Sequence, residues 1–445
     1  MGGFLAWWTR TIGRRNDDGT GTRESPDRAP VSAPSRRTAP DAQPARPVRA
    51  QAAPGREPGP LPQAAVGNAF ALALYARLRG TGANLICSPF SIRVVLAMVL
   101  AGARGETAAQ MKRALGFGDD EEALHGDMGA ALRWLESLRA NGCDFDVANS
   151  LWIQRGAPIL DGFRDRMERH YGGESRSVDY RTDAEAVRVR VNSWVEENTR
   201  GMIRELLSPR SLTRDTRLVL ANAIAFRGAW AFPFPADFTH DAVFRLATGA
   251  RRTASFMSQE EVLPYLKGPS YQAVDLPYQG ERLSLLVILP DADDGLEALE
   301  ERLDADWLRE CSRQLVRRQV EVELPKFRLE WGGHLRDELA ALGVNDVFDR
   351  SRADLSGING LRPPSEEALF VSQVVHRAVI EVDESGTTAA AASANVITTV
   401  SALPLPPPPP VFRADHPFLF AIRERASGAI LFLGRVVDPE GSPAP

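Results

Sequence analysis

The alternation of apolar and polar positions along the chain predicts several buried strands. Leu218–Phe226 (LVLANAIAF) and Leu283–Leu289 are apolar almost throughout, as in strands that are covered on both faces. Val320, Val322 and Leu324 alternate instead with glutamates, which predicts a strand with one solvated face. The chain is therefore expected to contain both fully covered and half-covered strands.

Other stretches carry the signals that begin and end helices. Ser88 followed by Pro89 predicts an N-cap and a first helical residue. Thr107–Gln110 has the spacing of a capping box for the next helix, which Gly116 should end. A later helix, expected to end at Gly201, should bury one face made of Val187, Val191, Trp194 and Val195.

The stretch Glu381–Ser401 (EVDESGTTAAAASANVITTVS) lies between a predicted strand, Leu369–Val382, and a proline tract. Its four consecutive alanines favour a helix on propensity alone. If the stretch is extended instead, alternate side chains share one face. That face is formed by small, uncharged residues: Thr387, Ala389, Ala391 and Ser393. It can be buried without steric clash and without an unpaired charge.

Composition narrows the class of protein. Of the 445 residues, 44% are apolar and 25% are charged, as in ordinary globular proteins. The formal net charge is −5, and ten arginines against six acidic residues within residues 1–62 leave the remainder mildly acidic. A nucleic-acid partner is therefore not expected. No run of 18 apolar residues occurs, so a membrane span is not expected either.

The N-terminal part differs from the rest. Residues 16–62 are rich in Pro, Ala, Arg and Asp, and they bury too little apolar surface to offset the entropy cost of ordering. We expect residues 1–62 to be a disordered tail and residues 63–445 to be one folded domain. The first fifteen residues lack the charge order and cleavage site of a signal peptide, which favours a cytoplasmic over a secreted protein.

The sequence lacks the motifs of common catalytic sites. It contains no GxSxG elbow, P-loop, HExxH or GxGxxG motif, and its six histidines are scattered. Cys87, Cys143 and Cys311 lie far apart without CxxC spacing, so we expect buried thiols and neither a disulfide framework nor a metal site. An enzyme, a cofactor and a bound metal are therefore not expected.

The alanine-rich stretch resembles the hinge of the reactive-centre loop in inhibitory serpins. The hinge pattern is matched at Glu384, Gly386, Thr387, Ala389–Ala392 and Ser393. Ser385 and Thr388 depart from it where the family usually has acidic residues, at positions that stay on the surface in the family. An alanine-rich linker or helix is the alternative interpretation of the stretch taken alone.

Further serpin motifs follow one another in the family's order. The first spans Asn84–Ile92 (NLICSPFSI), and the second begins at Asn222 and includes Gly228 and Trp230. Residues 416–438 predict a hairpin that turns at Ser427 and Gly428. They carry the family's C-terminal signature, HPF and GRVV. The resemblance covers about residues 63–445.

The resemblance implies an α+β fold with three β-sheets, a shell of eight or nine helices and an exposed reactive-centre loop at about residues 384–411. It also implies a serine protease inhibitor that acts as a suicide substrate. A serine protease, or alternatively a cysteine protease, attacks the loop and forms a covalent acyl-enzyme. The cut hinge then enters the main sheet as an extra strand. No cofactor is implied, and the inhibitor should be a monomer.

The scissile bond follows from the family's usual spacing after the hinge glutamate. Counting from Glu384 gives Val400–Ser401, and the small β-branched residue suggests an elastase-like or subtilisin-like target. A bond shifted to follow Ala402 or Leu403 stays open as an alternative. The reason is the tract 403–410 (LPLPPPPP), which lengthens the segment after the bond and favours a stiff polyproline II conformation.

Other matched positions belong to two regions of the family's main sheet. Four residues match the hydrogen-bonded cluster beneath the strands that must part: Ser88, Ser91, Asn222 and His376. Lys326 matches the partner of the hinge glutamate, and Trp230 matches the aromatic residue at the opening of the sheet. A non-inhibitory serpin fold that serves as a binding or chaperone-like protein is the alternative. It is disfavoured because residues 387–393 of the hinge include no bulky, charged or proline residue.

Overall fold

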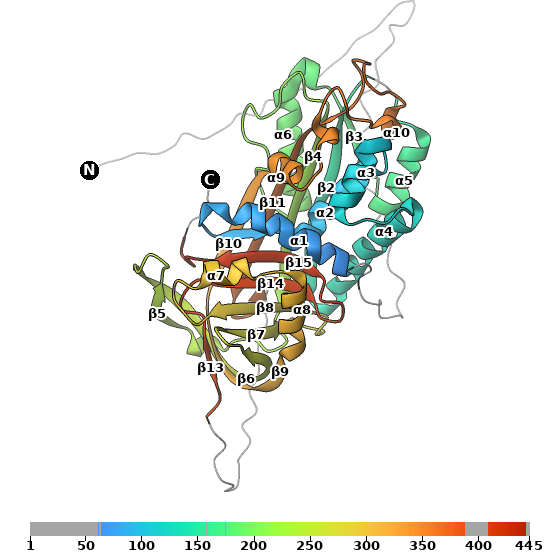
Figure 1. Ribbon diagram of the computed structural model, residues 1–445. Helices are drawn as coiled ribbons and strands as arrows, with labels where there is room; N and C mark the ends of the chain where they lie inside the picture. The colour runs from blue at the N-terminus through green and yellow to red at the C-terminus, as the bar shows by residue number, and fades with distance from the viewer. Residues whose placement is uncertain (1–60, 62–63, 157, 174, 388–407, 442–445) are drawn as a thin grey trace, which may run out of the picture. The chain divides into compact units, whose positions relative to one another are not determined.

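The computed structural model describes residues 61, 64–156, 158–173, 175–387 and 408–441 (Figure 1). Several predicted features fall outside these residues. They are the N-terminal tail up to residue 60, the hinge residues Ala389, Ala391 and Ser393, and the bond Val400–Ser401. The described hinge therefore ends at Thr387.

A six-stranded sheet carries the predicted strand that leads into the hinge. Its strand order is β10-β11-β12-β4-β2-β3, and β11 and β4 also pair directly. The strands are β10 (Phe327–His334), β11 (Val371–Asp383), β12 (Gly386–Thr387), β4 (Leu218–Ala229), β2 (Cys143–Gln154) and β3 (Ser175–Val178). The apolar run predicted as a doubly covered strand is β4, and all of its residues from Leu218 to Phe226 are buried.

A nine-stranded sheet contains the remaining strands. Its order is β1-β15-β14-β8-β7-β6-β9-β13, and β5 pairs with β6 off this path. The strands are β1 (Leu85–Cys87), β5 (His240–Arg245), β6 (Arg251–Lys267), β7 (Tyr271–Pro277), β8 (Leu283–Pro290), β9 (Val316–Pro325), β13 (Val411–Arg413), β14 (Phe418–Glu424) and β15 (Ile430–Val436). The predicted C-terminal hairpin is β14–β15.

The three expected sheets are hydrogen-bonded as two in this chain. The reason is β6, which is 17 residues long. It pairs with β5 over residues 251–256, with β9 over residues 256–265 and with β7 over residues 265–267. One unbroken strand therefore joins two groups of strands that would otherwise count as separate sheets. The α+β class is confirmed.

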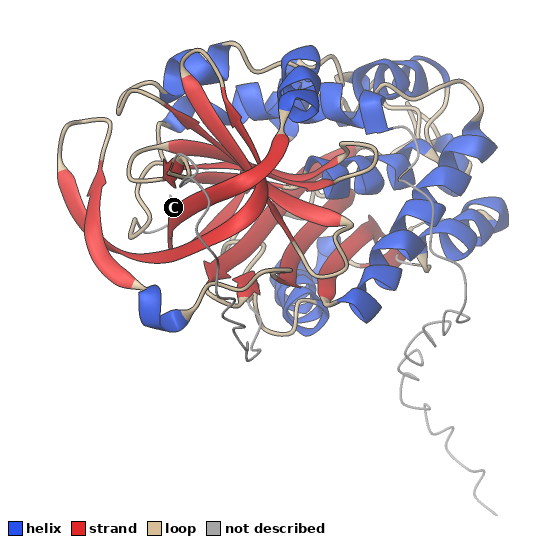
Figure 2. Cartoon of the chain, turned by 90° about the horizontal axis from the view of Figure 1, so that it is seen from below, coloured by secondary structure: helices blue, strands red, loops and turns tan. Residues whose placement is uncertain are grey.

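Ten α-helices lie within the described residues, against the eight or nine expected. They are α1 (Ala64–Leu78), α2 (Pro89–Leu100), α3 (Gly105–Leu115), α4 (Glu121–Ser137), α5 (Asp161–Tyr171), α6 (Tyr180–Asn198), α7 (Leu296–Glu301), α8 (Ala305–Gln314), α9 (Arg336–Ala341) and α10 (Ser356–Asn359). Short 3-10 helices span Arg79–Thr81, Leu138–Asn141, Ala236–Phe238 and Asp346–Phe348. In Figure 2 most helices gather along the upper and right-hand sides of the strands.

The capping box predicted at Thr107 and Gln110 is wrong. α3 begins at Gly105, and no side chain caps it. The hydroxyl of Thr107 accepts the backbone N–H of Asp354 at 3.0 Å, and the side-chain carbonyl of Gln110 accepts that of Asn345 at 3.0 Å. Both polar side chains therefore tie α3 to a distant loop. The predicted N-cap Ser88 and the terminating Gly116 of this region are confirmed.

The solvated face predicted for β9 is only partly present. Glu323 is buried, because Arg413 of β13 lies over it with a guanidinium nitrogen 2.6 Å from its carboxylate. The neighbouring Phe412 is fully buried. These contacts anchor β13, the first strand after residues 388–407.

The six-stranded sheet is covered on both faces where β4 and β11 meet. On one face, the predicted apolar side of α6 joins Ala223 of β4 and Val379 of β11 in one buried cluster. On the other face, Ile224 of β4 and Ile380 of β11 belong to a cluster shared with the nine-stranded sheet. Any residue placed between β4 and β11 would therefore be buried on both sides.

The three cysteines are free and buried, as predicted. Burial raises the pKa of Cys87 and Cys143 to about 12 and that of Cys311 to about 11. Thiolates at these positions are scarce at neutral pH, so none of the three is an activated nucleophile. Among α1–α10, no helix is long and apolar enough to cross a membrane.

Candidate functional site

The hinge begins as a two-residue strand wedged between β11 and β4. Gly386 and Thr387 pair antiparallel with Asp383 and Val382 of β11 and with β4 at Ala229 and Gly228. Below this point β11 and β4 pair directly with each other, and they run parallel. One end of the sheet thus already holds an extra strand, while the rest of the same gap is closed.

A tight turn brings the chain from β11 into β12. The carboxylate of Asp383 accepts the backbone N–H groups of Ser385 and Gly386 at 2.9 and 3.1 Å. Gly386 has a φ of 150°, and a Cβ atom there would lie 2.0 Å from the carbonyl oxygen of Gly228. Only glycine fits this position, because the backbone of β4 occupies the space of any side chain.

The predicted partners Lys326 and Glu384 meet beside the turn. The ammonium of Lys326 is 3.0 Å from the Glu384 carboxylate, and the hydroxyl of Thr239 donates to that carboxylate at 2.8 Å. Partial burial opposes ionisation of Glu384, but the hydrogen bonds and the Lys326 charge outweigh it and lower its pKa. The pair is half-exposed, so it contributes about 0–1 kcal/mol and mainly fixes geometry.

Aromatic rings form the floor under Thr387. The ring of Trp230 stacks on that of Tyr278 with centroids 4.7 Å apart, and its indole N–H donates to the carbonyl of Asp383 at 2.9 Å. The hydroxyl groups of Tyr278 and Thr387 are hydrogen-bonded at 2.8 Å, and both residues are fully buried. The side chain of Thr387 therefore points into the protein and is already buried against Tyr278.

The four residues of the predicted polar cluster meet in the structure between α2 and the sheet. The Ser88 backbone N–H donates to Nε2 of His376 at 3.1 Å, and the Asn222 amide donates to the Ser91 hydroxyl at 2.7 Å. Nδ1 of His376 donates to the side-chain carbonyl of Asn222. These contacts join α2, β4 and β11 at the point where His376 and Asn222 lie opposite each other.

The environment of His376 fixes its charge and tautomer. The ring is fully buried, and burial lowers its pKa to about 3. Nε2 accepts from a backbone N–H, so the proton of the neutral ring resides on Nδ1. The hydrogen bonds between β11 and β4 at this point are therefore made by neutral groups.

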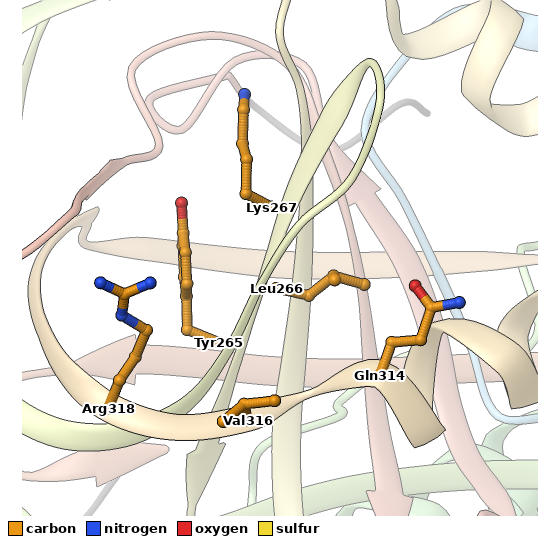
Figure 3. Close-up of a pocket in the computed structure, with 6 residues that line it drawn as sticks. All are labelled: Tyr265, Leu266, Lys267, Gln314, Val316 and Arg318. Carbon is orange, nitrogen blue, oxygen red and sulfur yellow. The ribbon is translucent and has the colours of Figure 1, made fainter.

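A hollow of about 520 Å³ lies where β6, α8 and β9 meet (Figure 3). Its lysine, Lys267, pairs with Asp291 at 2.5 Å, and the guanidinium of Arg318 lies over the ring of Tyr265. The hollow contains no activated nucleophile. Across the described residues, no group of three or more His, Cys, Asp or Glu side chains could hold a metal ion.

A sequence profile described as "Serpin (serine protease inhibitor)" matches residues 65–439. The chain belongs to the serpin family. The predicted family and its α+β fold are thereby confirmed. Serpins inhibit proteases and are not themselves enzymes, so the prediction that this chain is not an enzyme is confirmed as well.

Several characterised serpins are similar to this one. Leukocyte elastase inhibitors of Bos taurus and Sus scrofa are 39% and 40% identical to it over 386 residues, which is 83% of this chain and 97% of each relative. Among solved structures, uncleaved ovalbumin is 31% identical and superposes with a TM-score of 0.75. That likeness covers 84% of this chain and 99% of the ovalbumin chain.

Two residues of the serpin site were missed in the sequence. Tyr278 lies in a turn after β7, where nothing marks it as a neighbour of Thr387. Asn149 of β2 accepts from the Ser91 hydroxyl at 3.1 Å and from the Asn222 amide, and it lies directly across from Asn222. A signal for Asn149 was available, because a lone amide in an apolar strand needs a buried partner.

Acid should destabilise the intact serpin through His376. The unfolded ring titrates near pH 6.5 and the folded ring near pH 3, so the unfolded state binds more protons in between. The contribution of His376 is complete above pH 6.5 and falls on acidification by up to about 1.4 kcal/mol per pH unit. We expect the urea concentration at the midpoint of unfolding to be lower at pH 5 than at pH 7.5.

The matched variant is His376→Gln, which should be less stable at pH 7.5 but should lose less stability on acidification. A smaller acid effect should remain in this variant, because burial also lowers the pKa of His125, to about 4. An unchanged pH slope in His376→Gln would show that the titrating group lies elsewhere.

Proposed function

We propose that this serpin inhibits serine proteases as a suicide substrate, by inserting its cut loop between β4 and β11. One observation carries the proposal: β12 is antiparallel to both neighbours, which are parallel to each other. A strand that continues β12 can pair with β4 and β11 at once. It would replace one ladder of hydrogen bonds with two.

The register of β12 predicts where each inserted residue would lie. Thr387 pairs with Gly228 and Val382, so continuation brings Ser393 between Asn222 and His376. Thr387 faces the core, and every second residue after it shares that face. Ala389 and Ala391 would then enter beside the buried core of the nine-stranded sheet, and the Ser393 hydroxyl would reach the polar cluster.

The opposite face explains why the alanines are consecutive. Ala390 and Ala392 would point toward α6, next to Ala225 and Ala223 of β4 in the same register. That face is covered, because α6 packs over β4 and β11. The alternation of small residues predicts burial of one face only, whereas insertion beneath α6 requires small side chains on both faces.

The free energy that insertion would release is comparable with the stability of a whole domain. Roughly fourteen inserted residues that gain ladder hydrogen bonds at ~0.5–1.5 kcal/mol each would yield on the order of 10 kcal/mol. A typical domain has a stability of about 5–15 kcal/mol. Insertion could therefore distort a protease that is covalently attached to the moving strand.

The chemistry belongs to the protease. Its nucleophile attacks the carbonyl carbon of Val400, the Val400–Ser401 amide bond breaks, and the new α-amino group of Ser401 leaves with a proton. An ester, or a thioester with a cysteine protease, joins Val400 to the enzyme. Insertion before water attacks this bond traps the complex, whereas insertion after hydrolysis leaves a cut inhibitor and a free enzyme.

An elastase-like protease is the proposed target, with a subtilisin-like one as the alternative. Val400 would fill a small apolar specificity pocket, and a trypsin-like pocket would need Arg or Lys instead. The similar proteins named leukocyte elastase inhibitors support this assignment. We propose that one monomer captures one protease and that Trp230 and Lys326, at the opening of the sheet, guide entry of the loop.

Mixing with an elastase-like protease should give a covalent complex that survives denaturing electrophoresis. The reason is the ester bond to Val400, which boiling in detergent leaves intact. Mass mapping of the released C-terminal fragment should give Ser401 as its first residue. Cleavage without any complex, across several classes of serine protease, would instead favour a non-inhibitory serpin.

Cutting the loop should raise the melting temperature. An inserted strand adds hydrogen bonds to the six-stranded sheet, so the cut protein should unfold well above the intact one. Calorimetry on the intact protein and on protein nicked by a protease that is then removed makes the comparison. Equal melting temperatures would mean that the loop does not insert.

Ala389→Arg should convert the inhibitor into a substrate. Thr387 is already buried in the intact protein, whereas continuation of β12 would bring residue 389 between Phe226 of β4 and Ile380 of β11, both fully buried. Insertion would bury an unpaired guanidinium there at a cost of several kcal/mol, so hydrolysis would overtake insertion. The number of inhibitor molecules consumed per protease inactivated should rise at least tenfold. Ala389→Ser is the matched control, because it stays small and uncharged, and it should stay an inhibitor. Unchanged inhibition by Ala389→Arg would contradict insertion at this residue.

A further inference from the structure

The turn that follows α6 is tied to the six-stranded sheet by ion pairs. The Arg200 guanidinium donates through Nε to both carboxylate oxygens of Asp146, at 2.8 and 2.9 Å, and through Nη2 to Asp144. Asp144 and Asp146 are alternate residues of β2, so they lie on the same face, the one toward α6. We call these three residues the α6 clamp.

The α6 clamp is a built feature and not a chance surface pair. Asp146 is only 3% exposed and also pairs with Arg227 of β4. Arg200 has a φ of 52°, a left-handed conformation that costs free energy for any residue with a Cβ atom. The adjacent Thr199 is fully buried and fixes the turn through bonds to the backbone of Val195 and Ile203. The turn thus holds Arg200 in a strained conformation that lets it reach two carboxylates.

The α6 clamp lies at the end of the sheet where insertion would begin. Gly228 of β4 already pairs with Thr387, and the next residue of β4 is Arg227. Arg227 lies across from Asp144 in the β2–β4 register. The first residues to follow Thr387 would therefore enter one strand away from the carboxylates of the α6 clamp, on the other side of β4.

Opening the gap would disturb the packing of α6. The helix contacts one apolar cluster that contains residues of both β4 and β11. A new strand would move these two apart by about 4.8 Å, the spacing of neighbouring strands. The α6 clamp ties the end of the helix to β2 and, through Asp146, to β4, but it makes no bond to β11. The helix cannot lift at this end unless the α6 clamp opens.

We propose that the α6 clamp is a brake on loop insertion. It holds the end of α6 down over the entry to the gap and so sets how fast the cut loop moves in. Arg200 is a positioning residue in this step, since it touches neither the loop nor the protease. The inference rests on the proposed insertion mechanism and adds to it the group that controls its rate.

Arg200→Gly tests the brake. Glycine adopts the left-handed conformation without strain, and Asp146 keeps Arg227 as a partner, so the variant should fold. Each protein is nicked in its loop by protease, at rising concentrations until the rate saturates, and insertion is followed by tryptophan fluorescence in a stopped-flow instrument. We expect insertion to be on the order of tenfold faster in Arg200→Gly than in the natural sequence.

Two further variants make the result specific. Arg204→Ala removes the same charge from the same turn, but its side chain is 83% exposed and 3.9 Å from its partner Glu196, so its insertion rate should be unchanged. Arg200→Lys keeps the charge without the two-pronged geometry and should give an intermediate rate. Faster insertion should also lower the number of inhibitor molecules consumed per protease.

A merely structural role would lower the melting temperature of intact Arg200→Gly and leave the insertion rate alone. An insertion rate equal to or slower than that of the natural sequence would overturn the brake. Failure of the natural sequence to insert after nicking would instead contradict the proposed function. The two ideas can therefore fail separately.

Discussion

The parallel ladder between β4 and β11 holds the six-stranded sheet closed below the two residues of β12. Parallel pairing is slightly weaker per residue than antiparallel pairing. It also leaves the sheet able to accept an antiparallel strand that bonds to both neighbours. The intact fold is therefore one of two ways to complete this sheet, and in our proposal it is the less stable one.

A buried polar pair at the middle of the ladder resists its opening. His376 and Asn222 lie opposite each other, are fully buried and are hydrogen-bonded to each other across the gap. Separating β4 from β11 would break this bond and leave Nδ1 of His376 and the side-chain carbonyl of Asn222 unpaired in an apolar surrounding, which is costly until a new partner arrives. In the proposed register, that partner is the hydroxyl of Ser393. The hydrogen bond that is lost on opening and the one that replaces it are thus made by the same groups.

Much of this site could be predicted from the sequence, because motifs fix which residues meet even when their spacing is long. Ser88, Ser91, Asn222 and His376 were matched one by one, and the structure brings them together. The sequence motif identified Gly386 but did not explain why glycine is needed there. The structure explains it, because the register of β12 brings the carbonyl oxygen of Gly228 into the space of a side chain.

The rest could not be predicted, because it depends on contacts between elements that no local pattern encodes. Thr107 and Gln110 had the spacing of a capping box, but tertiary hydrogen bonds took both side chains. Glu323 has the sequence pattern of a solvated residue, but in the structure Arg413 covers it. The α6 clamp likewise joins residues more than fifty positions apart, and its left-handed arginine breaks the local preference that sequence reasoning uses.

The anchoring of β13 has a consequence for the fate of the severed chain. Phe412 is buried and Arg413 is paired with Glu323, and every residue of β14 and β15 beyond them is buried in the nine-stranded sheet. A protease that cuts near residue 400 therefore produces two polypeptides that remain associated, because the C-terminal one is held in the nine-stranded sheet. The cut inhibitor would remain one particle in solution, and its two fragments would separate only on denaturation.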